Sequence, residues 1–251
     1  KRDMIHNDAL PRLEEMLKRE ALDAADICTP HSYHHLAAIP CLESGLDVIT
    51  EKPFAVSIAA GLKMINAAKQ NGRILATAEN LRRGERERAT WWALNRKQYI
   101  GTPRLFFSDS LHFSLNVIAN TPWRHDKLWG GGGMTIDGGV HYAELLIYYF
   151  GDVERVYAET RNFEPARYMD PKAKTGPVAS TVEDTTVATL TFKNGLTGVW
   201  ALSSGAPGKG YGRTVYYGSD GSLDGDGVTR KDGTNIPMAT LQREFMESLS
   251  V

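Results

Sequence analysis

Cysteine is scarce in this sequence. Cys28 and Cys41 are the only two among 251 residues, and apolar residues surround both. Two such residues cannot form the disulfide framework of a small secreted protein or the ligand set of a zinc ribbon, so we expect a reducing compartment and a cytoplasmic location. The histidines also lack the spacing of metal ligands and a suitable carboxylate cluster, so no metal site is predicted.

Long apolar runs and an excess of charge are missing as well. No apolar stretch approaches the roughly 20 residues that a membrane-spanning helix needs. The formal net charge of −1 gives no bulk attraction to nucleic acid or to an acidic membrane surface, so neither is an expected partner. The 42% of hydrophobic and 24% of charged residues are ordinary for a soluble globular protein.

A glycine-rich phosphate-binding loop is the third absence. The glycines at 130–133 do not form a G-x-G-x-x-G pattern after a strand, and "GAPGKGYGR" at 205–213 falls between predicted strands. The sequence starts with Lys-Arg-Asp and stops at "EFMESLSV", in a predicted helix that is still under way. We therefore expect these residues to belong to a longer protein.

Strands and helices alternate over the first 80 residues. Helices are predicted at 8–20, 32–44 and 57–70, the second capped by Ser32 and containing Pro40, the third with Ile58, Leu62 and Ile65 on one stripe. Strands are predicted over "AADICTP", "GLDVIT" and "RILATAEN". This rhythm predicts parallel strands with crossover helices.

After residue 80 the pattern changes. A charged helix, a strand at 103–112 and a helix at about 135–150 precede a region dominated by strands. Its hairpin "TTVATLTFKNGLTGVWALSS" contains Asn194-Gly195 as a predicted two-residue turn. The sequence thus predicts a truncated α/β domain at 1–80, followed at 81–251 by an α+β domain built on a mostly antiparallel sheet.

Two short stretches place reactive residues at strand ends. In "CTPHSYHH", Thr29, Pro30 and His34 follow a strand at the edge where open α/β sheets bind ligands, although an ordinary turn with surface histidines is the more frequent meaning. Glu51-Lys52-Pro53 ends the next strand. Its lysine could bind a substrate hydroxyl or could form a surface ion pair, and the Lys-Pro bond is a candidate for the cis isomer.

A third stretch is "WGGGGMTIDGGVHYAELLIYYFG". Asp137 and His141 are four residues apart and would share a helix face, where the carboxylate could orient the imidazole for proton transfer. The alternative is that Asp137 only caps the helix. Gly138 and Gly139 would make sense if a ligand must approach the backbone closely.

In this order, "TPHSYH", "GLDVITEKP" and "GGGGMTIDGGVHYAELL" resemble the glucose–fructose oxidoreductase and inositol dehydrogenase (Gfo/Idh/MocA-like) family of NAD(P)-dependent oxidoreductases. The likeness runs from about residue 8 to about residue 225. It implies an incomplete Rossmann domain, whose first βαβ unit is not present here, then an open-faced sheet domain for substrate binding and oligomerisation. The implied cofactor is NAD or NADP, and the implied partners are a sugar or polyol substrate and further copies of the chain.

The resemblance also implies site residues. Lys52, Asp137 and His141 would be catalytic, with His141 as the acid–base residue in oxidation of a hydroxyl of a sugar, glycoside or cyclitol. The residues that would line the cofactor are Thr29, Pro30, His34, Glu51, Lys52, Pro53, Asn80 and Arg124. Two alternatives stay open: a non-catalytic cofactor-sensing or assembly protein of the same fold, and an NAD-dependent glycoside-cleaving enzyme.

Overall fold

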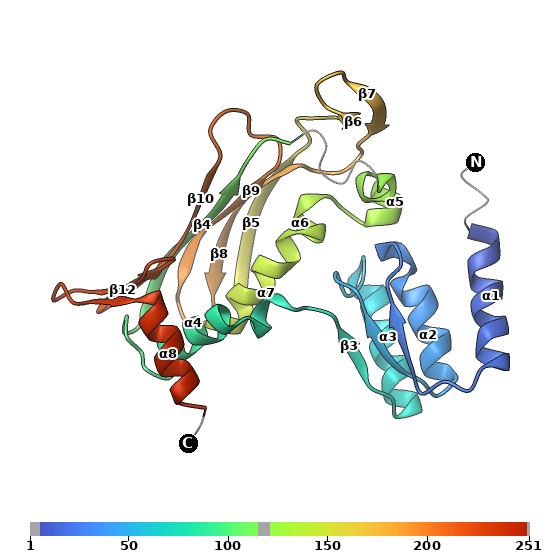
Figure 1. Ribbon diagram of the computed structural model, residues 1–251, viewed down its shortest axis with the longest axis horizontal. Helices are drawn as coiled ribbons and strands as arrows, with labels where there is room; N and C mark the ends of the chain where they lie inside the picture. Colours follow the sequence, from blue (N-terminus) through green and yellow to red (C-terminus); the bar gives the residue numbers. More distant parts are fainter. Residues whose placement is uncertain (1–5, 115–120, 250–251) are drawn as a thin grey trace.

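A three-stranded parallel sheet of order β1-β2-β3 forms the N-terminal region (Figure 1). The computed structural model describes residues 6–114 and 121–249. The elements of this region are α1 (His6–Arg19), β1 (Ala24–Ile27), η1 (His31–Tyr33), α2 (His34–Glu43), β2 (Asp47–Thr50), α3 (Ile58–Asn71) and β3 (Leu75–Thr77). Ile27, Thr50 and Thr77 are paired across the sheet, so the carboxyl ends of all three strands lie at one edge.

The core of this region joins the sheet to α2 and α3. Met64, Ala67 and Ala68 of α3 are buried in it. The predicted apolar stripe of the same helix points outward, because Ile58 is 83% and Leu62 is 53% exposed. Small side chains and one methionine, rather than the large aliphatic residues, therefore pack this helix on the sheet.

The start of α2 differs from the prediction of one helix capped by Ser32. Residues His31–Tyr33 form a 3-10 turn, in which the Tyr33 N–H donates to the Pro30 carbonyl at 2.9 Å. The α-helix begins only at His34 and has no side-chain cap, since the backbone turn takes that place. Pro40 lies inside α2, as predicted.

An eight-stranded sheet of order β13-β12-β11-β10-β4-β9-β8-β5 dominates the rest of the chain, with β4 and β9 as its parallel pair. Its strands are β4 (Pro103–Leu111), β5 (Val153–Arg161), β8 (Thr185–Phe192), β9 (Thr197–Ser203), β10 (Tyr211–Gly218), β11 (Gly221–Asp224), β12 (Gly227–Arg230) and β13 (Asn235–Pro237). β6 (Ala166–Asp170) and β7 (Thr175–Ala179) form a separate hairpin. The accompanying helices are η2 (Leu81–Arg83), α4 (Glu85–Asn95), η3 (Pro122–His125), α5 (Lys127–Gly130), α6 (Met134–Asp137), α7 (Gly139–Phe150) and α8 (Met238–Glu247).

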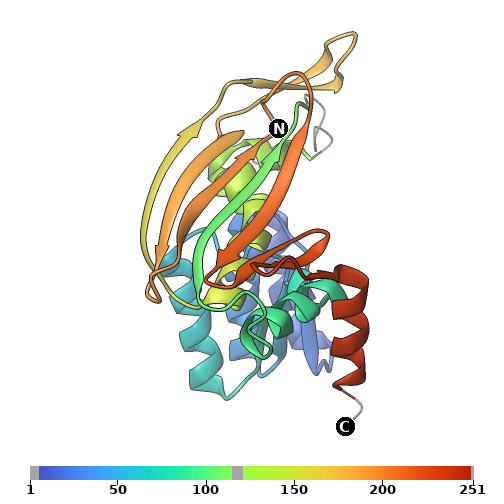
Figure 2. The same cartoon turned by 90° about the vertical axis from the view of Figure 1, so that its left-hand side faces the viewer.

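The two faces of this sheet differ. One face packs against α4, α7 and α8, and its buried side chains include Phe106, Trp200 and Tyr216. No helix of the described residues lies on the opposite face, as Figure 2 shows from that side. Apolar side chains there are partly exposed, among them Phe107 at 38% and Val187 at 48%. The sheet is therefore open on one side, and the predicted mostly antiparallel fold is confirmed.

The hairpin between β8 and β9 turns through three residues instead of the predicted two. Phe192 and Leu196 close the loop by a backbone hydrogen bond of 2.8 Å, and within it only Gly195 has a positive φ, of 88°. A two-residue turn of type I′ needs positive φ at both positions, which Asn194 does not adopt.

Among the described residues, no helix has both the length and the apolar character needed to cross a membrane.

Candidate active site

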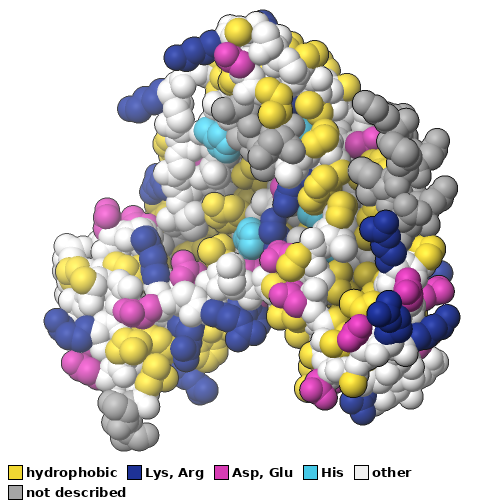
Figure 3. Space-filling view, turned by 45° about the vertical axis from the view of Figure 1, so that its right-hand side comes forward, with side chains coloured by type: hydrophobic (Ala, Val, Ile, Leu, Met, Phe, Trp, Pro, Cys, Tyr) yellow, Lys and Arg dark blue, Asp and Glu magenta, His cyan; other side chains and the backbone are white. Residues whose placement is uncertain are grey.

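The carboxyl edge of the parallel sheet faces the segment that runs from η3 to the start of α7. The residues after β1, β2 and β3 are Thr29-Pro30, Glu51-Lys52 and Glu79-Asn80. Ligands of open α/β sheets bind at this edge. In Figure 3, histidine, basic and acidic side chains lie together beside the hollow that separates two lobes of the molecule.

Lys52 crosses from this edge to the second region. Its Nζ donates to the Asp137 carboxylate at 2.9 Å and to the Asp137 carbonyl at 2.6 Å. The neighbouring Glu51 carboxylate instead accepts the backbone N–H of Lys52 at 3.1 Å, so Glu51 and Lys52 do not form the surface ion pair considered above. The Lys52–Pro53 peptide bond is cis, as the sequence indicated it could be.

Asp137 is the centre of a cluster of basic side chains. Besides Lys52, its carboxylate contacts the Arg124 guanidinium, and the His31 ring nitrogen Nε2 lies 3.5 Å away. Burial alone would raise the pKa of Asp137, but His31, Lys52 and Arg124 together hold the pKa well below its usual range. Asp137 is the last residue of α6 and caps no helix, so the alternative role of a helix cap is wrong.

His141 has a different partner from the one predicted. α6 ends at Asp137 and a new helix, α7, begins at Gly139, so Asp137 and His141 do not lie on one continuous helix face. The Nδ1 of His141 lies 2.8 Å from each oxygen of Glu79, the residue two positions beyond β3. Glu79, and not Asp137, therefore orients the imidazole.

The glycine pair before His141 has a packing reason. A Cβ atom at Gly139 would lie 2.8 Å from the Trp200 indole, whereas one at Gly138 would meet nothing closer than 3.5 Å. Close approach is thus required at Gly139 by a core tryptophan of β9, a packing reason that the sequence did not indicate.

His34 does not line the cleft. Its ring is fully buried, with Nδ1 2.9 Å from the Pro53 carbonyl and Nε2 3.2 Å from the Thr29 carbonyl. Burial lowers the pKa of His34. The ring joins the turn after β1 to the cis-proline turn after β2, so it supports both predicted cofactor segments from beneath.

Of the two remaining predicted cofactor residues, Arg124 belongs to the Asp137 cluster and Asn80 does not. Arg124 reaches Asp137 and lies over the Trp123 ring at 4.4 Å. Asn80 is exposed and makes no capping hydrogen bond at the start of η2. Glu79 and His31 were not predicted as site residues, although both adjoin predicted ones, Asn80 and Pro30. The rule that selected Lys52, position just beyond a parallel strand, would also have selected Glu79.

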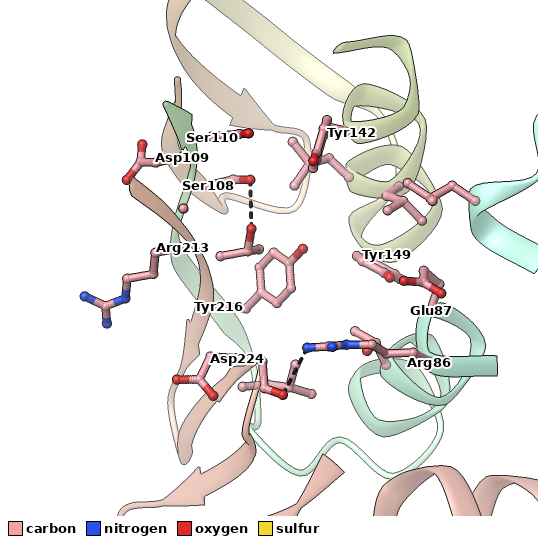
Figure 4. A pocket seen from close by; sticks show the side chains of 18 of the residues that line it. Arg86, Glu87, Ser108, Asp109, Ser110, Tyr142, Tyr149, Arg213, Tyr216 and Asp224 are labelled. Carbon is pink, nitrogen blue, oxygen red and sulfur yellow. Dashed lines mark hydrogen bonds between the residues drawn. The ribbon is translucent and has the colours of Figure 1, made fainter. Parts of the chain in front are cut away.

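A cavity of about 450 Å³ lies between α4, α7 and the covered face of the sheet (Figure 4). Hydroxyl groups are frequent in its wall: Ser108 and Thr214 are hydrogen-bonded at 3.1 Å, and Tyr142 and Tyr216 also line it. Tyr142, the residue after His141, and Leu81, whose N–H Glu79 accepts, are among the lining residues. Burial raises the pKa of Tyr216, which keeps its hydroxyl protonated.

Two family models match the chain. The GFO/IDH/MocA C-terminal domain matches residues 90–224, and the NAD-binding Rossmann fold of the oxidoreductase family matches residues 2–79. A 1,5-anhydro-D-fructose reductase of Ensifer adhaerens is 26% identical over 91% of this chain and 63% of its own length. A D-apiose dehydrogenase of Paraburkholderia graminis is 29% identical over 73% of this chain and 44% of its own length.

A solved structure agrees with these matches. The oxidoreductase domain protein from Kribbella flavida is 30% identical, with a TM-score of 0.70 over 84% of this chain and 56% of that one. The chain thus spans between 44% and 63% of the lengths of these three proteins. Since one model alone covers more than half of the chain and the other matches its N-terminal sheet, the chain belongs to the GFO/IDH/MocA family of oxidoreductases.

Proposed function

We propose that this chain carries the catalytic residues of an NAD(P)-dependent oxidoreductase that oxidises a hydroxyl of a sugar, glycoside or cyclitol to a carbonyl by hydride transfer, or runs the reverse reduction. Residues 1–80 would contribute to cofactor binding and residues 81–251 to substrate binding. One observation carries the proposal. Two residues at the edge of the Rossmann sheet bond residues of the second region. Lys52 bonds Asp137, and Glu79 bonds His141. These two partners lie on either side of Gly138-Gly139.

The carboxyl edge has features that suit a bound cofactor. The Thr29 hydroxyl is buried and has no hydrogen-bond partner among the described residues, so a polar ligand group could satisfy it. Glu51, Lys52, Pro53, Asn80 and Arg124 would complete the contacts, and Pro30 and His34 would shape the turns. A bound nicotinamide supplies the hydride acceptor or donor.

The protein's own residues would manage the proton and the substrate hydroxyl. In the oxidation direction, His141 takes the hydroxyl proton, and in reduction it returns the proton. A positioned acid–base residue accelerates such reactions by about 10² to 10⁴-fold. Lys52 donates a hydrogen bond to the same oxygen, while Asp137 holds the ammonium group in place through the 2.9 Å contact.

The sugar or polyol class rests on two further observations. The named relatives are a 1,5-anhydro-D-fructose reductase and a D-apiose dehydrogenase, and the cavity lined by Tyr142 has several hydroxyl groups in its wall. The tryptophans of the η3–α5 segment do not add to this support. Trp123 packs on His31 with ring centroids 4.7 Å apart, and Trp129 packs on Tyr33 at 5.5 Å.

The test is turnover by the purified full-length protein with NAD⁺ or NADP⁺ and a panel of aldoses, glycosides and inositols. Reduced cofactor should accumulate with at least one substrate, and H141N should lower kcat by about 10² to 10⁴-fold. H35N, a change in α2 outside the site, serves as the control. Product release without net reduced cofactor would favour the glycoside-cleaving alternative. Cofactor binding without any turnover would favour a sensing or assembly role.

We also propose that copies of the chain associate through the open sheet face. Large apolar side chains on that face are partly exposed, including Leu105 at 36%, Phe107 at 38% and Tyr157 at 70%. Apolar surface of this kind on a sheet typically becomes an interface. Light scattering should find an oligomer, and F107D, with a charge at the centre of the face, should shift it toward the monomer.

A further inference from the structure

We propose that Glu79 is the positioning residue that fixes the tautomer of His141, so that Nε2 is the nitrogen that exchanges the proton. The inference rests on the proposed function for its catalytic meaning, but its structural core can be tested separately. Both Glu79 oxygens lie 2.8 Å from Nδ1 of His141. A carboxylate can only accept, so Nδ1 must carry the hydrogen.

The carboxylate itself is fixed. Its Oε1 also accepts the backbone N–H of Leu81 at 3.0 Å, which anchors the side chain to the first residue of η2. Its side chain is only 11% exposed, and that of His141 is 23% exposed. A side chain tied at one end to the backbone and largely shielded from water can select one orientation of the ring.

The Nε2 atom remains available. Within the described ranges, His141 forms hydrogen bonds through Nδ1 to Glu79, and none is found at Nε2. With Nδ1–H donated, Nε2 has the lone pair that a general base needs. The geometry thus gives the two nitrogens different tasks: Nδ1 for orientation and Nε2 for proton transfer.

Other charged groups near the pair are already neutralised. Glu144, one turn after His141 on α7, is paired with Arg82 of η2. Asp137 of α6 is paired with Lys52 and Arg124. Among the described residues, the ion-pair contact of Glu79 is with His141 alone. Its carboxylate is therefore directed at the imidazole.

The sharpest variant is E79Q, because the amide has one oxygen and one NH₂ group. If the amide oxygen keeps the Leu81 N–H, the NH₂ group faces Nδ1 and donates to it, which places the ring hydrogen on Nε2. Loss of the correct tautomer by this route can lower kcat by several orders of magnitude. We expect E79Q to reduce kcat about 100-fold or more with little change in KM, and E79A to be less harmful than E79Q. A purely packing role predicts the opposite order.

The experiment combines kinetics with nitrogen NMR of histidine-labelled full-length protein. In the wild type the His141 signals should report Nδ1–H, and in E79Q they should report Nε2–H. E144Q, which removes a carboxylate already paired with Arg82, is the matched control and should keep the wild-type tautomer and kcat. Thermal unfolding checks that each variant folds.

Two results would overturn the inference: an Nε2–H tautomer in the wild type, or E79Q with unchanged kcat and tautomer. Failure of the proposed function gives a different result. The Nδ1–H tautomer would then be present in a protein that turns over no substrate.

Discussion

Asp137 and Glu79 are two carboxylates that both join the region of the three-stranded sheet to the region of the eight-stranded sheet, and they do so in different ways. Asp137 belongs to the second region and receives the cations Lys52 and Arg124. Glu79 belongs to the first region and receives a single titratable ring, that of His141. One carboxylate is paired with two cations, whereas the other meets the ring that we propose as the acid–base group.

In the proposed mechanism, this difference separates the anchoring of Lys52 from proton transfer at His141. The partners of Asp137 keep its pKa below the usual range, so it stays ionised and fixes the Lys52 ammonium group. A carboxylate in that state is a poor partner for a base that must change charge, because its field is already cancelled by cations. Variants of each carboxylate should therefore affect stability and turnover in different proportions.

The largest expected effect comes from D137N. It leaves Lys52 and Arg124 close together without their anion. Breaking such a pair destabilises a buried site by about 3 to 5 kcal/mol, and we expect about 2 to 3 kcal/mol here because both cations keep some solvent contact. Removing the group that positions Lys52 should also lower kcat by about 10² to 10³-fold. Urea unfolding and steady-state kinetics measure the two effects. E79Q should lower kcat with little change in stability, and a D137N protein of wild-type stability would remove the contrast.

K52M should follow, with a loss in kcat/KM of about 10² to 10³-fold because a preorganised donor to the reacting oxygen is removed. The stability loss should be smaller than for D137N, since Arg124 still neutralises Asp137. Kinetics with saturating cofactor measure this effect, and K63M on the exposed surface of α3 is the control. Equal activity of K52M and K63M would contradict a role for Lys52 in turnover.

G139A tests the contrast between the two carboxylate pairs by disturbing the packing of α7, the helix that carries His141. The added Cβ would lie 2.8 Å from Trp200, so the indole or α7 must shift. A shift of α7 would carry His141 with it, while Asp137 lies in the preceding helix. Overpacking of this kind costs about 1 to 3 kcal/mol. G138A is the matched control, because its Cβ has only ordinary contacts. Thermal unfolding should rank G139A below G138A, and the reverse order would show that the indole moves instead of the helix.

The sequence was sufficient where the pattern is local. The parallel order follows from the strand rhythm and the cis Lys52–Pro53 bond from a short motif, and the structure agrees with both. The Asp137–His141 pairing failed because four-residue spacing implies contact only on a continuous helix, and α6 ends between them. Glu79 could be identified as a strand-end residue, but its partner 62 positions away becomes evident only when the two regions are assembled.

His34 and the α3 stripe show a second limit. A histidine after a strand predicts a ligand contact or a surface position, yet this one is completely buried between two carbonyls. Periodicity identified Ile58 and Leu62 as one face of a helix but could not say which face the sheet would cover. Both errors concern burial, which depends on neighbouring elements and not on local pattern.

The smallest expected effect is on acid stability, and it is specific to Asp137. Its pKa is lowered in the folded protein, so its contribution to stability is complete above the unfolded value near 4 and is lost as pH falls below that value. The contribution of Asp137 to the urea midpoint of the wild type should be constant above about pH 5 and should decline below about pH 4. D137N should start lower and lose less over the same interval, because an amide does not titrate. E79Q is the comparison variant. If the urea midpoints of D137N and the wild type declined in parallel, the cations around Asp137 would not be stabilising its ionised form. Asp137 would then not be the ionised anchor that distinguishes it from Glu79.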